Sequence, residues 1–425
     1  MPDHPTTLRL RLAIATAMLL AAAPIAGQQP RAVTLDEALE LFVANNLELR
    51  VARAEAAEAA SLARQAAAYP NPTLIGSHEP LSNGDGSYSE TYVNLSQRFE
   101  WPGTRRARRD AAARTAAAAA ARLTADSARL AFEVKRAYTE AAQAARAERV
   151  LTRVTEVFRT GERNAEERYA AGDISLYDRR RIGLERARYE TRLAEAVLDA
   201  ASARRQLALL VAPNAEDPQL APADSLTGLP PVIVPEQVLE LALARRGEVA
   251  AAGAAAGSER AAASTARRER IPDLTATGGY KTQSDGLNGA FLGLSLPLPL
   301  WDRRGGAVDA AEARLAAAEA RLALTRRQVE NDVQRALETY ESLARRAEPL
   351  GRTVTGEAAD LLDIARAAYA EGEMELIELL DAAEALWEAQ TAEARLRAEL
   401  WTAYYDVERA VGGFDGGMND GEDGQ

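Results

Sequence analysis

Two segments of the chain alternate between hydrophobic and polar positions. The apolar positions are Val93, Leu95, Phe99 and Trp101 in residues 91–101, and Leu292, Leu294, Leu296 and Leu298 in residues 290–298. A period of two with one apolar face is typical of a β-strand. A shorter strand-like stretch precedes each segment, at residues 73–78 and 274–281. The pattern therefore predicts four strands in two pairs, with a loop at residues 80–87.

Most of the remaining chain has the hydrophobic spacing of helices. Residues 104–211 contain no proline and predict a helical hairpin that turns at Gly172. Its first arm would be about 100 Å long at 1.5 Å per residue. Residues 305–411 predict a second hairpin that turns at Gly372, and Pro349 predicts a kink in its long arm.

A further helix is expected before each strand pair, at residues 33–69 and 236–270. Thr34 is a good N-cap for the first of these helices, with Glu37 three residues later, as in a capping box. The prolines that follow Tyr69 would end this helix before the strands begin.

The same elements occur twice, 200 residues apart. Leu39-Glu40-Leu41 recurs as Leu239-Glu240-Leu241, and Ala170-x-Gly172 recurs as Ala370-x-Gly372. Solenoid units are about 20–50 residues long, so this repeat is too long for a solenoid. It indicates a duplicated half-protein.

The duplication predicts the organisation of the chain. We expect a signal peptide at residues 1–27, a first repeat at 28–212, a linker at 213–235, a second repeat at 236–411 and a disordered acidic tail at 412–425. The signal peptide is predicted because Arg9 and Arg11 precede a short apolar run that ends in small residues. No cysteine follows that run, which argues against a lipoprotein anchor.

The composition excludes several functions. The chain has no cysteine and only two histidines, His4 and His78, so thiolate metal sites and cysteine nucleophiles are excluded. A net charge of −12, with arginine and glutamate interleaved, argues against nucleic acid as a partner. No catalytic constellation or phosphate-binding glycine loop is present, so we expect neither enzymatic activity nor a cofactor. A resident metal site is not expected either.

Four strands cannot close a barrel, and open strand edges in lipid are costly. Bacterial barrels have at least about eight strands, so several chains would have to share one barrel. Two copies would supply eight strands and three would supply twelve; the residues alone favour neither. Four aromatic residues near predicted strand ends suit a membrane-interface belt, although ordinary core packing is an equal alternative for the tryptophans. These residues are Trp101, Trp301, Tyr69 and Tyr280.

The chain resembles the TolC-like outer-membrane efflux proteins over essentially its whole mature length. The duplication, the paired strands and several local sequences carry the resemblance. These sequences are Tyr69-Pro70-Asn71-Pro72, Tyr369-Ala370-Glu371-Gly372, Leu376-Ile377-Glu378-Leu379-Leu380-Asp381-Ala382 and Val407-x-x-Ala410-Val411-Gly412. The second tip and Leu296-Pro297-Leu298-Pro299-Leu300 look most like the heavy-metal, CzcC-like branch.

The resemblance implies a mainly α fold with a small β portion. Three identical chains would form a twelve-stranded transmembrane β-barrel that continues as a periplasmic α-helical barrel. The implied location is the outer membrane, and the implied partners are outer-membrane lipid, a periplasmic adaptor (membrane fusion) protein and an inner-membrane efflux pump of the RND type. The implied function is a passive duct for substrates such as heavy-metal cations.

Two other functions stay open at this point. A duct of the same fold could serve drug efflux or protein secretion, because the sequence does not identify the cargo. From another class, the chain could be a soluble periplasmic coiled-coil or adaptor protein. The strand pairs that end in tryptophan argue against that class.

In the family, the tip turns contact the adaptor and acidic residues ring the periplasmic entrance. The adaptor-contact positions then fall on Ala171, Gly172, Asp173, Glu371, Gly372, Glu373 and Met374. Asp173 and Glu373 depart from the commoner pattern, in which a basic or hydroxyl residue follows the glycine. The two glycines could instead serve only as turn residues with positive φ.

The entrance ring would fall on Glu378 and Asp381, which share one helix face. Three copies would place these carboxylates in a constriction that admits cations and repels anions. The alternative is a solvated helix face. Their equivalents in the first repeat are Asp178 and Arg181, so we expect the second return arm to be the inner, gating helix.

Overall fold

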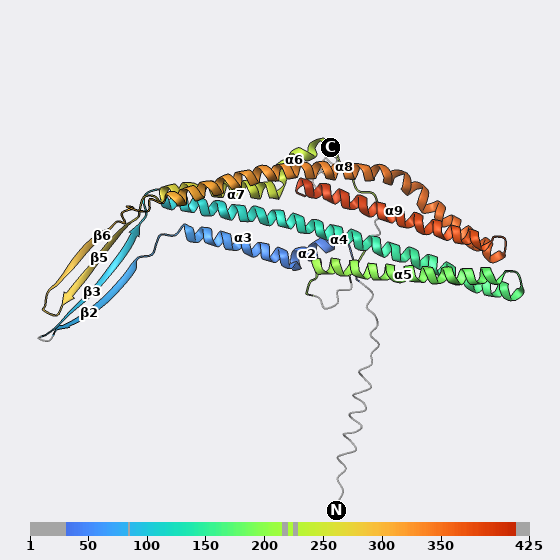
Figure 1. The fold of residues 1–425 in the computed structure, drawn as a ribbon, viewed down its shortest axis with the longest axis horizontal. Helices are drawn as coiled ribbons and strands as arrows, with labels where there is room; N and C mark the ends of the chain where they lie inside the picture. The colour runs from blue at the N-terminus through green and yellow to red at the C-terminus, as the bar shows by residue number, and fades with distance from the viewer. Residues whose placement is uncertain (1–30, 84–85, 215–219, 224–227, 414–425) are drawn as a thin grey trace, which may run out of the picture.

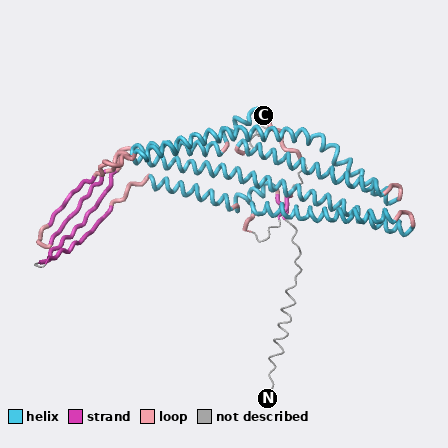
Figure 2. Tube along the Cα trace, in the orientation of Figure 1, coloured by secondary structure: helices cyan, strands magenta, loops and turns pink. Residues whose placement is uncertain are grey.

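The computed structural model describes residues 31–83, 86–214, 220–223 and 228–413. A four-stranded sheet lies at one end of an elongated molecule, long helices run away from it, and two helical turns form the opposite end (Figures 1 and 2). The predicted signal peptide, and the predicted tail beyond residue 413, lie outside the described residues.

The helices and strands follow the same order in both repeats. The first repeat contains α2 (Leu35–Asn45), α3 (Leu47–Ala66), β2 (Thr73–Asn83), β3 (Gly86–Phe99), α4 (Thr104–Ala171) and α5 (Leu176–Val211). The second contains α6 (Val238–Arg245), α7 (Gly247–Arg268), β5 (Leu274–Gln283), β6 (Asn288–Ser295), α8 (Gly305–Glu371) and α9 (Leu376–Val411). Short elements near the linker are β1 (Arg31–Val33), β4 (Leu220–Pro222) and a 3₁₀ turn, η1 (Pro235–Gln237).

The two longest helices span the whole helical part of the molecule. In the half nearest the sheet, α4 packs against α3 and α7, and α7 packs against α8 (Figure 1). In the half nearest the tips, α4 packs against α5 and α9, and α9 packs against α8. The shorter helices are therefore stacked end to end beside α4 and α8.

Buried side chains gather at two levels along the helices. Near the tips, Phe158 of α4 stacks on Tyr189 of α5, with ring centroids 4.6 Å apart, in a cluster that includes Leu379 of α9. Midway along the helices, the first repeat buries Phe42 and Tyr138. The second repeat buries a corresponding cluster on α8 and α9. These clusters fix the register of neighbouring helices.

A buried asparagine joins the stacked helices of the first repeat. The Asn46 side chain accepts a hydrogen bond from the backbone N–H of Leu49 at 2.9 Å, and so caps the start of α3. It also donates to the Leu210 carbonyl at 3.0 Å, near the end of α5. The helix predicted at 33–69 is therefore confirmed as helical over most of its length but wrong as one continuous helix, because the chain breaks at Asn46. Its first residue is also wrong, because Val33 pairs in β1 with β4.

In the second repeat, a glycine lies at the corresponding contact between the stacked helices. Gly412, which caps α9 with a φ of 92°, lies so close to the backbone of Arg245 and Arg246 that a Cβ would stand 2.9 Å from the Arg245 carbonyl oxygen. The predicted helix at 236–270 is accordingly divided at Arg246. By contrast, α8 continues without interruption through Pro349.

The sheet is antiparallel, in the order β2-β3-β5-β6. In the register, Val93 lies between Gly76 and Tyr280, and Tyr280 lies opposite Ala290. Positions in register with Val93 form an apolar face that also carries Leu74, Leu95, Phe99, Leu292 and Leu294. The opposite face is mostly polar.

The strand bounds differ from those predicted. β2 continues to Asn83 and β3 begins at Gly86, so the loop expected at residues 80–87 is wrong. Pro80 misled the prediction, because a proline is tolerated in an edge strand, where its missing N–H breaks no ladder bond. β6 ends at Ser295 rather than at 298, before Pro297, and β3 ends at Phe99 rather than at 101.

We predict that Gly247→Ala destabilises the protein by about 1–3 kcal/mol. A Cβ at Gly247 would stand 2.7 Å from the backbone nitrogen of Ala125 in α4, which cannot move independently of its helix. Gly253→Ala in the same helix is the matched control, because a Cβ there meets nothing within 4 Å. The control should be neutral or stabilising by up to about 1 kcal/mol. Thermal unfolding measures both, and equal midpoints for the two variants would contradict the close packing of α4 and α7.

Candidate functional site

The two tips have the same backbone geometry. Gly172 ends α4 with a φ of 85°, and Gly372 ends α8 with a φ of 80°. After each glycine, the next backbone N–H returns to the helix: Asp173 donates to the Arg168 carbonyl at 2.8 Å, and Glu373 donates to the Ala368 carbonyl at 2.9 Å. This left-handed helix end explains both glycines, because other residues adopt that conformation only at a cost.

Both return helices begin with a capping box. Asp178 and Ser175 cap the start of α5. In α9, the Glu378 carboxylate accepts a hydrogen bond from the backbone N–H of Glu375 at 3.0 Å. Glu378 therefore has a structural role at the helix start, which explains why both repeats carry an acidic residue here. Asp381 is exposed one turn further along.

The predicted tip residues divide into exposed and packed positions. Ala171, Gly172, Asp173, Glu371, Gly372 and Glu373 are exposed. Met374 is half-buried and packs against the apolar cluster between the tip helices, as does Ile174 of the first tip. Met374 therefore anchors its turn, and the exposed surface of the tips comes from the residues around the glycines.

A cross-tip contact joins the two turns. The Arg168 guanidinium donates to the Tyr369 carbonyl at 3.3 Å and lies over the Tyr369 ring, 5.4 Å from its centroid. Burial raises the pKa of the Tyr369 hydroxyl, which has no hydrogen-bond partner in the described chain. The sequence did not predict this contact, because its two residues lie 201 positions apart.

One face of α9 is mainly acidic from the tip to the middle of the molecule. Asp381, Glu384, Glu388, Glu399 and Asp406 recur at spacings that place them on one side of a helix. Arg395 lies on the same side and pairs with Glu399. Of these carboxylates, the sequence analysis singled out only Asp381, although the spacing of the others by three or four residues, or by multiples of them, can be read from the sequence.

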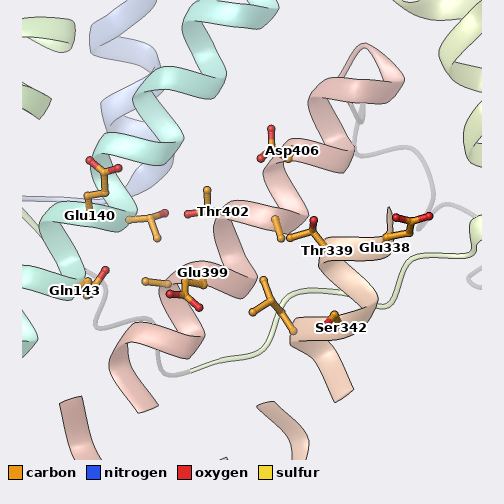
Figure 3. Close-up of a pocket in the computed structure, with 12 residues that line it drawn as sticks. Glu140, Gln143, Glu338, Thr339, Ser342, Glu399, Thr402 and Asp406 are labelled. Carbon is orange, nitrogen blue, oxygen red and sulfur yellow. The ribbon is translucent and has the colours of Figure 1, made fainter. Parts of the chain in front are cut away.

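Figure 3 shows the groove at the upper end of this acidic face, between α4, α8 and α9. Its volume is about 660 Å³, and four carboxylates line it. The labelled residues are Glu140, Gln143, Glu338, Thr339, Ser342, Glu399, Thr402 and Asp406. Arg136 pairs with Glu140, and Arg395 pairs with Glu399, both at 2.8 Å. Burial raises the pKa of Asp406, whose nearest cation, Arg409, is 3.8 Å away.

A buried ionic triad ties the two repeats together. Glu393 of α9 is 1% exposed. It pairs with Arg146 of α4 and with Arg397 of α9, each at 2.7 Å. Buried charges are tolerated only when they are paired, so this triad fixes α9 against α4.

The four predicted interface aromatics are all exposed, but they do not lie at one level. Tyr69, Trp101 and Trp301 lie at the junction between the sheet and the helices, where Trp101 donates to the Pro272 carbonyl at 2.6 Å. Trp301 is 93% exposed, which contradicts the core-packing alternative for this residue within one chain. Tyr280 lies inside β5, near its opposite end, and its hydroxyl bonds to Asn288 at 2.6 Å.

None of the helices in the described ranges has both the length and the hydrophobicity that a membrane span requires.

Within the same ranges, no group of three or more histidine, cysteine, aspartate or glutamate side chains is arranged to hold a metal ion.

Comparison with known proteins shows what the chain is similar to. Residues 238–413 match the family described as outer membrane efflux protein. Over 382 residues the chain is 28% identical to the cobalt-zinc-cadmium resistance protein CzcC of Cupriavidus metallidurans, a match that covers 89% of this chain and 90% of CzcC.

Solved structures of efflux channels have the same fold. The Campylobacter jejuni CmeC outer membrane channel superposes with a TM-score of 0.75 at 17% identity, covering 93% of this chain and 91% of CmeC. CusC superposes with a TM-score of 0.73 at 19% identity, covering 91% and 93%. The chain therefore has the fold of the solved outer-membrane efflux channels.

We predict that Glu393→Gln lowers stability by about 3 kcal/mol, because it leaves two arginines without their buried counter-charge. Glu399→Gln is the matched control on the same helix, since it removes an exposed pair with Arg395 worth less than about 0.5 kcal/mol. Thermal unfolding of the two variants measures the difference. A Glu393→Gln variant as stable as the control would show that the triad does not fix α9.

Proposed function

We propose that the protein is the outer-membrane channel of a tripartite efflux system, a passive trimeric duct from the periplasm to the exterior. The observation that carries this proposal is the sheet at one end of the helical hairpins (Figure 1). Its apolar face is exposed along all four strands, with side chains such as Leu292 and Leu294 70–80% exposed. Such a face favours contact with lipid.

The strand edges support closure by several chains. β2 and β6 are the outer strands of the sheet within the described chain. In lipid each needs a partner, and β2 of one chain can pair with β6 of the next around a rotation axis. Three chains would supply twelve strands, a number within the range of bacterial barrels. We therefore propose a homotrimer.

The opposite face of the sheet suits a water-filled lumen. Glu90 pairs with Lys281 at 2.6 Å, and Tyr92 donates to Glu79 at 3.2 Å. Ser96 and Thr277 bond across β3 and β5 at 3.1 Å. Polar side chains of this kind belong on the inner face of a channel.

The far end of the molecule suits docking. The exposed backbone and side chains around Gly172 and Gly372 present six compact turns per trimer, held rigid by the Arg168 contact. We propose that a periplasmic adaptor protein binds there and connects the duct to an inner-membrane pump of the RND type. Asp173 and Glu373 make these turns acidic, so the complementary adaptor surface would be basic.

We propose that the cargo includes divalent heavy-metal cations. The similarity to CzcC, a cobalt-zinc-cadmium resistance protein, supports this cargo. The acidic face of α9 supports it independently, because its carboxylates would line the duct from the entrance inward if α9 is an inner helix. The corresponding positions of α5 carry Arg181, Leu184 and Arg188 near the tip, which favours α9 as the inner arm.

We predict that the purified trimer forms cation-selective channels in planar bilayers. A deletion strain should become sensitive to cobalt, zinc or cadmium, and regain resistance when the gene is restored. Sensitivity to drugs alone would replace the proposed cargo while leaving the duct intact. A chain that stays monomeric and yields no conductance would contradict the duct itself.

We predict that Glu378→Gln with Asp381→Asn reduces cation selectivity and block by divalent ions. Six carboxylates per trimer would be lost at the entrance, and unpaired charges at a constriction dominate its selectivity. Asp178→Asn with Glu185→Gln, at the start of α5, is the matched control and should leave selectivity unchanged. Reversal potentials in a salt gradient measure both. Identical potentials for wild type and the Glu378/Asp381 double variant would remove these residues from the entrance.

A further inference from the structure

The junction between the sheet and the helices has a charge opposite to that of the whole chain. Three segments meet there, at residues 98–110, 267–273 and 301–304. They contain ten arginines and five carboxylates, a net charge of +5 in a chain whose net charge is −12. The arginines are Arg98, Arg105, Arg106, Arg108, Arg109, Arg267, Arg268, Arg270, Arg303 and Arg304. We call these three segments the arginine collar.

Contacts within the chain explain only part of the collar. Arg105 and Arg108 donate to the carbonyls of Ala66, Ala67 and Ala68 at the end of α3, where positive charge is favourable, at 2.7–3.1 Å. Arg106 and Arg109 make no such contact, although they lie near the start of α4, where positive charge is unfavourable and no acidic residue occupies the first turn. These two arginines indicate a counter-charge outside the chain.

Two adjoining grooves organise the collar on one side of the molecule. The first has a volume of about 460 Å³, lies between α4 and α7, and is lined by Arg106, Arg114, Arg260 and Arg268, with Asp110 as the one carboxylate among its lining residues. The second lies next to it, shares Arg106 and Gly103, and has aromatic side chains on its wall. Those aromatics are Tyr69, Phe99 and Trp101.

The second groove adjoins the apolar face of the sheet. Phe99, which lines this groove, belongs to that face at the helix end of β3. Arg98 and Glu100 line the groove as well, and with Arg108 they also line a pocket beside the residues that follow β6. The aromatic groove therefore reaches the apolar surface at the end of β3, and the arginine groove adjoins it at Gly103 and Arg106.

The charges in these grooves are only partly neutralised. Arg106 and Arg109 share Asp110, at 4.0 and 3.9 Å, and Arg106 is 81% exposed. Arg260 pairs with Glu319 at 2.5 Å. For the side chains of Arg114 and Arg268, no ion pair or hydrogen bond exists among the described residues.

We propose that the arginine collar binds the headgroups of anionic phospholipids in the periplasm-facing leaflet of the outer membrane. This inference rests on the proposed function, which turns the apolar face of the sheet toward lipid. Acyl chains would lie against Phe99 and the apolar face, Trp101 would lie at the level of the glycerol backbone, and the phosphate would meet Arg106, Arg109 and Arg268. Arginine is suited to this role because its planar guanidinium can bind two phosphate oxygens.

The position of the grooves leaves them open in a trimer. In this half of the molecule the helix order is α3, α4, α7, α8, and the grooves lie at the middle pair. Neighbouring chains would join through β2 and β6, which continue from the flanking helices α3 and α8. A neighbouring chain would therefore cover the flanks and leave the collar to lipid.

The test uses the purified trimer in nanodiscs, with its own tryptophans as reporters. Phosphatidylcholine nanodiscs receive increasing amounts of phosphatidylglycerol with brominated acyl chains, which quench nearby tryptophan. Trp101 and Trp301 belong to the collar segments, whereas Trp387 and Trp401 are on α9, away from the sheet (Figure 1). Brominated phosphatidylcholine at the same fraction gives the quenching expected from random mixing.

We expect phosphatidylglycerol to quench more than phosphatidylcholine at equal fraction, and the excess to fall at high salt. The variant Arg106→Gln/Arg109→Gln/Arg268→Gln should weaken the apparent affinity for phosphatidylglycerol by about tenfold or more. The matched control Arg149→Gln/Arg153→Gln/Arg326→Gln removes the same charge from exposed helix positions far from the sheet and should keep the wild-type affinity.

Two outcomes would overturn the proposal. The first is equal quenching of the wild-type protein by the two lipids, a result that does not depend on any variant folding. The second is a collar variant that keeps the full excess quenching. If that variant also loses sedimentation with purified cell-wall sacculi, the collar belongs to an acidic cell-wall polymer instead. Conductance measured on the same preparations separates these failures from a failure of the duct, because a working channel without lipid preference contradicts only this inference.

Discussion

The unpaired backbone along β2 and β6 is the constraint on which the rest of the structure depends. Within the described residues four strands leave two open edges, and in the proposed membrane setting hydrocarbon offers no hydrogen-bond partner for them. In the proposed channel, one chain therefore cannot complete the sheet alone. Because each strand pair leads directly into a long helix, closing the sheet among several chains also sets the positions of α4 and α8 around the same axis. The helical part inherits its geometry from the sheet.

The long hairpins and the apolar strands could be predicted because their signals are local. Gly172 and Gly372 mark the tips, and prolines mark the other ends of the first hairpin. The breaks at Asn46 and Arg246 could not be predicted, since the groups that make them favourable lie on another helix. The Leu210 carbonyl, for example, is 164 positions from Asn46. Pro80 produced the opposite error, because its tolerance depends on β2 being an edge strand.

In the candidate sites, too, local features could be predicted and long-range contacts could not. The turn glycines were predicted from the sequence. The capping role of Glu378 could also have been predicted, because Glu378 lies three residues after Glu375, the N-cap of α9. The Arg168–Tyr369 contact and the buried triad around Glu393 could not, because both join the first repeat to the second. The collar was not predicted, because arginine and glutamate are interleaved along the sequence and only the fold brings residues 98–110 beside 267–273. Charge is thus divided along the molecule: basic at the junction and acidic along α9.

The end-to-end stacking of the short helices has a consequence for how such a molecule can change in evolution. α4 lies beside both α3 and α5, and the Asn46 joint holds those two helices in contact. An insertion in α4 alone would pull that joint apart or displace the tip contact at Tyr369. The length of the duct is therefore a collective property, which can change only when whole helical turns are added to the long and short helices of both repeats together. The duplicated architecture therefore does not allow the length of one helix to change without matching changes in the others.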